Sequence, residues 1–265
     1  MKAIYKFLQI SVIICMISGI CGCTTEVQGD TSGVSNKLHA WGFKRNPNAA
    51  PNILEEERDL LARNGGIYIG NEQEKRLYLT FDNGYEKGYT PKILDTLREH
   101  NVTATFFITG HYLDANEDLV RRIVDEKHHI GNHTIHHVVM PNESDEKNRK
   151  ELDDLKMKFR EKFGENAEMK YMRPPKGEYS ERTLKLTKEL GYTTVFWSSA
   201  YVDWDESKAG DRDNAFKMIT SQFHNGSIIL LHNTSQNNAD VLGDVIKAAR
   251  EAGFEFGNLD EIAQL

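Results

Sequence analysis

The sequence predicts an α/β protein, a distorted (β/α) barrel with seven parallel strands. Three observations support this class: short β-branched or aromatic runs recur along the chain, helix-like segments with capping signals lie between them, and reactive polar side chains follow five of the runs. Strands that alternate with helices are joined by crossovers, which makes them parallel and favours a closed or nearly closed barrel. A doubly wound open sheet is the alternative.

Seven segments are expected to form the strands, because each is short and rich in β-branched or aromatic residues. In order they are residues 77–81, 104–108, 129–132, 170–173, 193–197, 228–231 and 254–256. No repeat or linker interrupts residues 75–265, so we expect one domain of catalytic size there.

Six helices are expected between these strands. Pro91 stands at the first helical position, where its missing N–H costs nothing, and another helix opens at residues 116–118. The other four end at a glycine or shortly before one, and glycine suits this position because it adopts the left-handed conformation without a Cβ penalty. The remaining helices are expected over residues 142–163, from 180 to Gly191, 213–224 and 238–252.

The N-terminal region precedes the first of these strands and divides into three parts. Residues 1–22 suit a signal peptide of lipoprotein type: two lysines precede an apolar run over 7–20 that is short for a bilayer-spanning helix. Gly22-Cys23 resembles a bacterial lipobox, so Cys23 is expected to be lipidated; an uncleaved anchor and an ordinary secretion signal are the alternatives. Residues 23–37 suit a flexible tether, and 38–74 an extension that packs on the barrel.

Charge and cysteine content exclude several classes of function. The 265 residues include 33 Lys and Arg against 40 Asp and Glu, for a net charge of −7. Nucleic acids are bound by basic surfaces, so this chain is not expected to bind them. All three cysteines (Cys15, Cys21 and Cys23) lie in the first 23 residues, so the body has no disulfide and no thiolate zinc site. We expect an exported, extracytoplasmic monomer held at the membrane by its N-terminus.

Polar side chains gather where predicted strands end, which is the edge at which α/β barrels hold their active sites. His133 and His137 are expected on one face of a helical turn, a spacing that suits two imidazole ligands of a metal such as zinc. The chain has no HExxH, GxSxG, Walker A or GxGxxG motif. Zincin proteases, elbow-serine hydrolases, P-loop enzymes and Rossmann enzymes are therefore excluded.

Five motifs, in order, resemble those of the NodB-type polysaccharide deacetylases across residues 75–265. They are TFDN at 80–83, HTIHH at 133–137, RPPKG at 173–177, DW at 203–204 and LLH at 230–232. The longer stretches TFDNGYEKGYTPKILDTL and VFWSSAYVDW are most similar to the delta-lactam-biosynthetic de-N-acetylases (PdaA-like). That subgroup removes acetyl groups from N-acetylmuramic acid in peptidoglycan, a step toward the muramic δ-lactam of spore cortex.

The resemblance implies a peptidoglycan N-deacetylase, a hydrolase of linear amide bonds whose partner is the glycan strand. It implies that His133 and His137 hold a divalent metal, with zinc expected first and manganese, cobalt or magnesium as alternatives. The family usually has two consecutive aspartates, the second being a metal ligand, and Asn83 stands there instead. An amide oxygen is neutral, so Asn83 is a candidate third ligand that should weaken metal binding. The subgroup shares this asparagine, which therefore does not indicate inactivation.

The resemblance also implies an acid and a base. Asp82 resembles the general base, kept ionised by a bidentate pair with Arg173. His232 resembles the general acid, oriented by Asp203. The residues implied to meet the substrate are Leu230 at the acetyl methyl group, Trp204 packed beside it, and Lys176 through a nearby backbone N–H.

Two other functions fit the same motifs. One is a deacetylase of N-acetylglucosamine in peptidoglycan or chitin, or an acetyl esterase, because the metal site contacts only the acetyl group. The other is a surface lipoprotein that binds glycan without catalysis, which Asn83 suggests. The presence of both an acid and a base argues against a mere binder.

Overall fold

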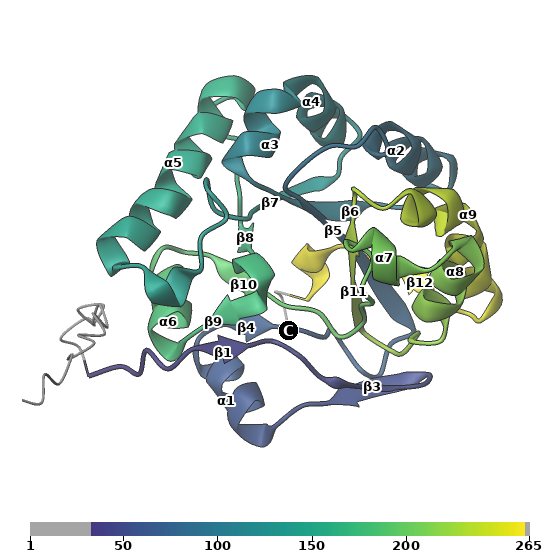
Figure 1. Cartoon of the computed structure of the whole chain (residues 1–265), viewed down its shortest axis with the longest axis horizontal. Helices are drawn as coiled ribbons and strands as arrows, with labels where there is room; N and C mark the ends of the chain where they lie inside the picture. Colours follow the sequence, from purple (N-terminus) through teal and green to yellow (C-terminus); the bar gives the residue numbers. More distant parts are fainter. Residues whose placement is uncertain (1–32, 263–265) are drawn as a thin grey trace, which may run out of the picture.

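Parallel strands form a curled sheet at the centre of the molecule, and helices cover its outer side (Figure 1). The computed structural model describes residues 33–262, so the predicted signal peptide, Cys23 and most of the tether lie outside the described residues. Across the sheet the strands are β11 (Ser227–His232), β5 (Arg76–Asn83), β6 (Ala104–Ile108), β7 (His129–Asn132), β8 (Tyr171–Met172), β10 (Thr193–Val195) and β4 (Gly66–Ile67), and β12 (Glu255–Phe256) also pairs with β5.

All seven predicted strands are present, and the sheet curls as a barrel instead of forming a doubly wound open sheet. β4 is an additional strand from the N-terminal region. It pairs in parallel with β10 through Gly66 and Thr194. Two residues later, Ile69 forms an antiparallel bridge to Ser227 at the start of β11. Residues 66–69 thus fill the space between the two ends of the sheet.

The six predicted helices are present with shifted ends, and the described residues add α1, α3 and α7 to them. They are α1 (Glu55–Arg63), α2 (Thr90–Glu99), α3 (Gly110–Ala115), α4 (Glu117–Asp125), α5 (Asp145–Phe163), α6 (Glu181–Glu189), α7 (Glu206–Ala209), α8 (Arg212–Thr220) and α9 (Gln236–Glu251). The long helix begins after residue 142, because Met140–Asn142 forms a separate 3₁₀ turn, η1, and the Ser144 hydroxyl accepts from the Lys147 N–H as the helix cap. Within residues 33–262, none of the helices is long and apolar enough to cross a bilayer.

The N-terminal extension lies against one side of the barrel, below the sheet in Figure 1. Its strand β1 (His39–Ala40) pairs with β9 (Glu178–Tyr179), and β2 (Lys44–Asn46) and β3 (Ala49–Asn52) form a hairpin. Trp41 is buried against Phe196, with ring centroids 4.8 Å apart. Its indole N–H donates to the Trp197 carbonyl at 2.9 Å, and its backbone N–H donates to the Gly177 carbonyl at 2.8 Å. The extension therefore supports the turn η2 (Pro175–Gly177), which forms the last three residues of the RPPKG motif.

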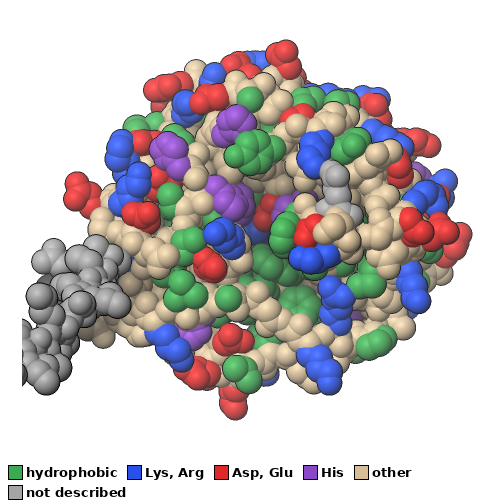
Figure 2. All heavy atoms as spheres, in the orientation of Figure 1, with side chains coloured by type: hydrophobic (Ala, Val, Ile, Leu, Met, Phe, Trp, Pro, Cys, Tyr) green, Lys and Arg blue, Asp and Glu red, His purple; other side chains and the backbone are tan. Residues whose placement is uncertain are grey.

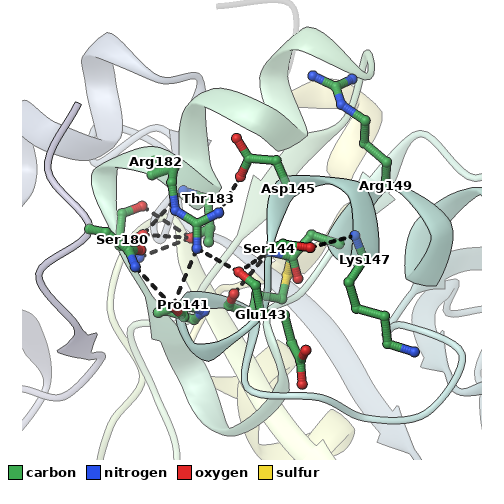
Figure 3. A network of polar contacts seen from close by, with 12 residues as sticks. Pro141, Glu143, Ser144, Asp145, Lys147, Arg149, Ser180, Arg182 and Thr183 are labelled. Carbon is green, nitrogen blue, oxygen red and sulfur yellow. Dashed lines mark hydrogen bonds and ion pairs between the residues drawn. The ribbon is translucent and has the colours of Figure 1, made fainter. Parts of the chain in front are cut away.

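A buried arginine of α6 joins that helix to the start of α5 and to the chain just before α5 (Figure 3). Arg182 pairs with Asp145, the first residue of α5, and donates to the carbonyls of Pro141 at 3.3 Å and Glu143 at 2.7 Å. Asn36 also donates to Pro141, at 3.0 Å. These contacts hold the start of α5 in place directly after the segment that contains the predicted metal ligands.

Candidate active site

The alternation of side chains along neighbouring strands brings four predicted site residues together. Side chains of Tyr78, Phe107, Tyr171 and Ile228 pack inside the barrel. Residues two or four positions further along a strand point to the same side. Gly131 lies beside Phe107 in the register of β6 and β7, so His133, two positions further on, faces the same side. The residues at these inward positions, at the carboxyl ends of the strands, are Asp82, His133, Arg173 and His232.

Asp82 and Arg173 form a buried ion pair. The guanidinium Nη1 donates to Asp82 Oδ1 at 2.7 Å, and Arg173 has no exposed surface. Nη2 donates instead to Thr80 Oγ1 at 2.9 Å, so the expected bidentate contact is wrong and a single hydrogen bond joins the pair. Burial alone would raise the pKa of Asp82, but the charge and hydrogen bond of Arg173, together with His133 and His232, outweigh burial and hold the pKa below its usual value. The carboxylate is therefore ionised at neutral pH.

The two histidines of the HTIHH motif face each other, with ring centroids 5.0 Å apart. His133 Nδ1 lies 2.8 Å from the Arg173 carbonyl oxygen, which can only accept, so Nδ1 bears the proton and Nε2 has a free lone pair. Nε2 lies 3.6 Å from Asp82 Oδ2. Burial lowers the pKa of His133 to about 4 and also lowers that of His137. Both imidazoles are thus neutral, as metal ligands must be.

The segment that holds these histidines is not helical, so the expected helical turn is wrong. Thr134 and His137 both have left-handed backbones, with φ of 63° and 57°. A turn with these two left-handed residues brings the rings of His133 and His137 within 5.0 Å of each other. Gly110 packs against the segment so closely that a Cβ there would lie 2.3 Å from Ile135 Cγ1. Tertiary packing, not local helical periodicity, therefore sets the geometry.

Asn83 is fully buried, and neither atom of its amide group has a hydrogen-bond partner among residues 33–262. It is the last residue of β5, directly after Asp82. Across residues 33–262 no group of three or more His, Cys, Asp or Glu is placed to hold a metal. Two neutral imidazoles and an unpartnered buried amide nevertheless suit a divalent cation with nitrogen and neutral oxygen ligands.

His232 and Asp203 form the second charged pair of the site. His232 Nδ1 donates to Asp203 Oδ1 at 2.7 Å, and its backbone N–H donates to Oδ2 at 2.7 Å. Asn238 donates to the same Oδ2 at 2.6 Å. Burial lowers the pKa of His232, but the charge and hydrogen bond of Asp203, together with the charge of Asp82, outweigh burial, and the net shift is upward. His232 also stands directly beside Asp82 in the register of β11 and β5.

The three predicted substrate contacts differ in exposure. Leu230 is buried two residues before His232, as a pocket wall must be, and Lys176 is exposed with a left-handed backbone. Trp204 is 59% exposed, and Lys208 Nζ lies 6.0 Å from its ring centroid. Trp204 is therefore largely open to solvent, and its expected packing beside Leu230 stays a prediction.

The sequence analysis did not single out the rim residue Tyr85. The side chain of Tyr85 is 67% exposed, and its ring centroid lies 4.9 Å from that of His111. The side-chain amide of Asn233, the residue after His232, donates to the Tyr85 backbone carbonyl at 2.8 Å. An exposed aromatic ring next to a strand-end motif was the available signal. Figure 2 shows the face of the molecule as a hollow with histidine side chains at its edge and apolar side chains below.

Comparison with known proteins agrees with this architecture. The profile of the polysaccharide deacetylase family matches residues 69–195. The peptidoglycan-N-acetylmuramic acid deacetylase PdaA of Bacillus subtilis is 42% identical over 86% of this chain and 87% of its own length. A peptidoglycan-N-acetylglucosamine deacetylase of Bacillus cereus is 34% identical over 71% of this chain and 88% of its own.

The chain therefore belongs to the polysaccharide deacetylase family. A solved structure of B. subtilis PdaA, described as a family 4 carbohydrate esterase, superposes with a TM-score of 0.83 at 41% identity. It covers 86% of this chain, and the match covers 98% of that one. The fold and the enzyme class follow from these similarities: this chain is a polysaccharide deacetylase with the curled barrel of family 4.

Proposed function

We propose that this enzyme removes N-acetyl groups from peptidoglycan, and specifically from N-acetylmuramic acid on the route to the muramic δ-lactam of spore cortex. The observation that carries the proposal is the arrangement of two charged pairs at adjacent positions of β5 and β11. One pair keeps a carboxylate ionised, and the other favours a protonated imidazole. Amide hydrolysis needs both groups, because a proton must leave the attacking water and another must reach the departing amine.

The residues of the chain divide the proton transfers between them. Asp82, ionised beside Arg173, accepts the proton of the attacking water. His232 donates a proton from Nε2 to the leaving amine, because Nδ1 is held by Asp203. When bound at His133 and His137, with Asn83 as the candidate third ligand, a divalent cation such as zinc supplies Lewis acidity that polarises the acetamide carbonyl.

The rim supports a sugar with a negative charge. Lys176 is exposed and lies close enough to the histidine pair that its charge helps burial to lower the pKa of His137. Muramic acid bears a lactyl carboxylate when its stem peptide is absent, whereas N-acetylglucosamine has no charge. A cation at the rim therefore favours muramic acid, while exposed Tyr85 and Trp204 offer flat surfaces for sugar rings.

The experiment is mass spectrometry of muropeptides after incubation with cortex-like glycan, with and without stem peptides, in the presence of different divalent ions. Deacetylated muramic acid on peptide-free chains supports the proposal. Acetate released only from glucosamine units supports the first alternative, an N-acetylglucosamine deacetylase. Binding to glycan without acetate release, with the Asp82→Asn variant behaving as the unchanged protein does, supports a non-catalytic binding protein.

The cellular location is also a proposal. The lipobox-like Gly22-Cys23 and the apolar run before it support export and anchoring of a monomer through an acylated Cys23. Mass spectrometry of the mature N-terminus tests this, and an intact N-terminal methionine on the protein from cells would contradict it.

A further inference from the structure

We propose that Glu151 of α5 is a positioning residue, whose buried carboxylate holds the turn between His133 and His137 in the shape that directs both imidazoles at one cation. The inference rests on the proposed function, since it concerns the metal site named there. Glu151 itself touches neither histidine ligand.

Besides an ion pair of Oε1 with Lys147 Nζ at 3.0 Å on the same helix, the contacts of Glu151 converge on the middle of this turn. Its side chain is 1% exposed. Oε2 accepts from the His136 backbone N–H at 2.9 Å, and Oε1 accepts from His136 Nδ1 at 2.8 Å. The Glu151 backbone carbonyl accepts from the Ile135 N–H at 3.1 Å. One helical residue thus binds two consecutive residues, Ile135 and His136, that separate the predicted ligands.

The surroundings complete a template for the turn. Asn132 donates to the Leu152 carbonyl at 2.9 Å and accepts from the Thr134 N–H at 2.9 Å. On the opposite side, the Gly110 N–H donates to the Ile135 carbonyl at 3.1 Å. The turn is therefore held between one turn of α5 and the start of α3, and α5 is itself fixed by the Asp145–Arg182 pair (Figure 3).

The energetics explain why a carboxylate is used there. Left-handed backbones at Thr134 and His137 cost about 1–3 kcal/mol each unless surrounding contacts enforce them. Hydrogen bonds from N–H groups to a buried carboxylate are among the strong ones. Leu152 and Leu155, on the same helix, are packed in the apolar core, and an apolar residue at 151 would pack there without the cost of burying a charge. The His136 side chain is 66% exposed, so its bond to Glu151 is not required to fill the core.

The test compares variants of the full chain in zinc titrations against a competing chelator and in visible spectra of the cobalt-loaded protein. Glu151→Gln keeps the volume but offers one acceptor in place of two, and we expect about tenfold weaker zinc binding or more, with a changed cobalt spectrum. Glu161→Gln is the matched control, because Glu161 is an exposed residue of the same helix. It should bind zinc as the unchanged protein does.

A second pair of variants approaches the same bond from the exposed side, where substitution leaves the core intact. His136→Ala removes the Nδ1 donor and should weaken zinc binding, whereas His136→Asn places an amide N–H near the position of Nδ1 and should restore part of the affinity. The inference is overturned if folded Glu151→Gln, or His136→Ala, binds zinc as tightly as the unchanged protein and with the same cobalt spectrum.

The unchanged protein and the His133→Ala variant test the proposed metal site separately from the role of Glu151. If the unchanged protein binds no zinc, or binds it as well after His133→Ala, the metal site itself is wrong and the positioning role falls with it. If the unchanged protein binds zinc through His133 and only the Glu151 and His136 variants show no effect, the metal site stands and the positioning role alone is wrong.

Discussion

Replacing Arg173 with methionine tests the electrostatic centre of the site. Methionine fills part of the space but leaves the Asp82 carboxylate, whose side chain is 10% exposed, without its cation. Breaking a buried pair from one side costs about 3–5 kcal/mol. Because a domain of this kind is stable by only about 5–15 kcal/mol, this single change should remove a large part of the stability. Lysine at 173 keeps the charge but loses the hydrogen bonds to Thr80 and Val195, at about 1 kcal/mol each.

The assay is urea unfolding of the metal-free protein at neutral pH, followed by circular dichroism, with the slope of the transition checked for constancy. The double variant Asp82→Asn/Arg173→Met leaves no unpaired charge at this pair. Its loss in free energy of unfolding should therefore be smaller than the sum of the losses of the two single variants, by roughly 1–3 kcal/mol. Additive losses, or a loss below about 1 kcal/mol for Arg173→Met alone, would refute the reasoning.

The pH dependence of the same pair has a definite sign. Burial raises the folded-state pKa of Asp82, but Arg173, with His133 and His232, outweighs burial, so the net shift is downward. The pair therefore contributes stability at pH values above the unfolded pKa of about 4, and this contribution is lost as the pH falls through the lower folded pKa. Arg173→Met should abolish that acid-side dependence.

Three further predictions concern activity and metal binding. Asp203→Asn removes the charge that raises the pKa of His232, so the alkaline limb of the kcat profile should move to lower pH; an unmoved limb would contradict the role of Asp203. Asp82→Asn should lower kcat by about 10²–10⁴-fold while the protein stays folded, and acetate assays on purified glycan measure this. Asn83→Asp should tighten zinc binding and destabilise the metal-free protein, because it buries an unpaired carboxylate; calorimetric titration showing equal or weaker affinity would contradict the assignment of Asn83 as a ligand.

The sequence predicts the strands and the rim residues well because both leave local signals. Each of the seven strands is a short β-branched or aromatic run, and the polar residues at their ends follow from the parallel arrangement. β4 leaves almost no such signal: it is two residues long, and its partner β10 lies in a distant part of the chain. Its pairing is therefore visible only in three dimensions.

The errors at the metal-ligand turn have a related cause. The i,i+4 spacing of His133 and His137 suggests a helix. Packing against Gly110 and Glu151 instead imposes a left-handed backbone at Thr134 and His137, where the sequence has no glycine to indicate it. Glu151 is one of several acidic residues in the charged segment that forms α5. Nothing in the pattern distinguishes it from its exposed neighbours, because the distinction arises from which face of the helix is buried.

The contact between Trp41 and the RPPKG turn has a consequence for the order of assembly. Trp41 binds Trp197 across 156 residues of chain, and a Cβ at Gly177 would lie 2.8 Å from the Trp197 ring and 3.1 Å from Trp41 Cβ. Trp41 can thus dock only after the chain has been made as far as Trp197. Contacts between residues so far apart in sequence form slowly, so we expect the support of the RPPKG turn to be completed late in folding.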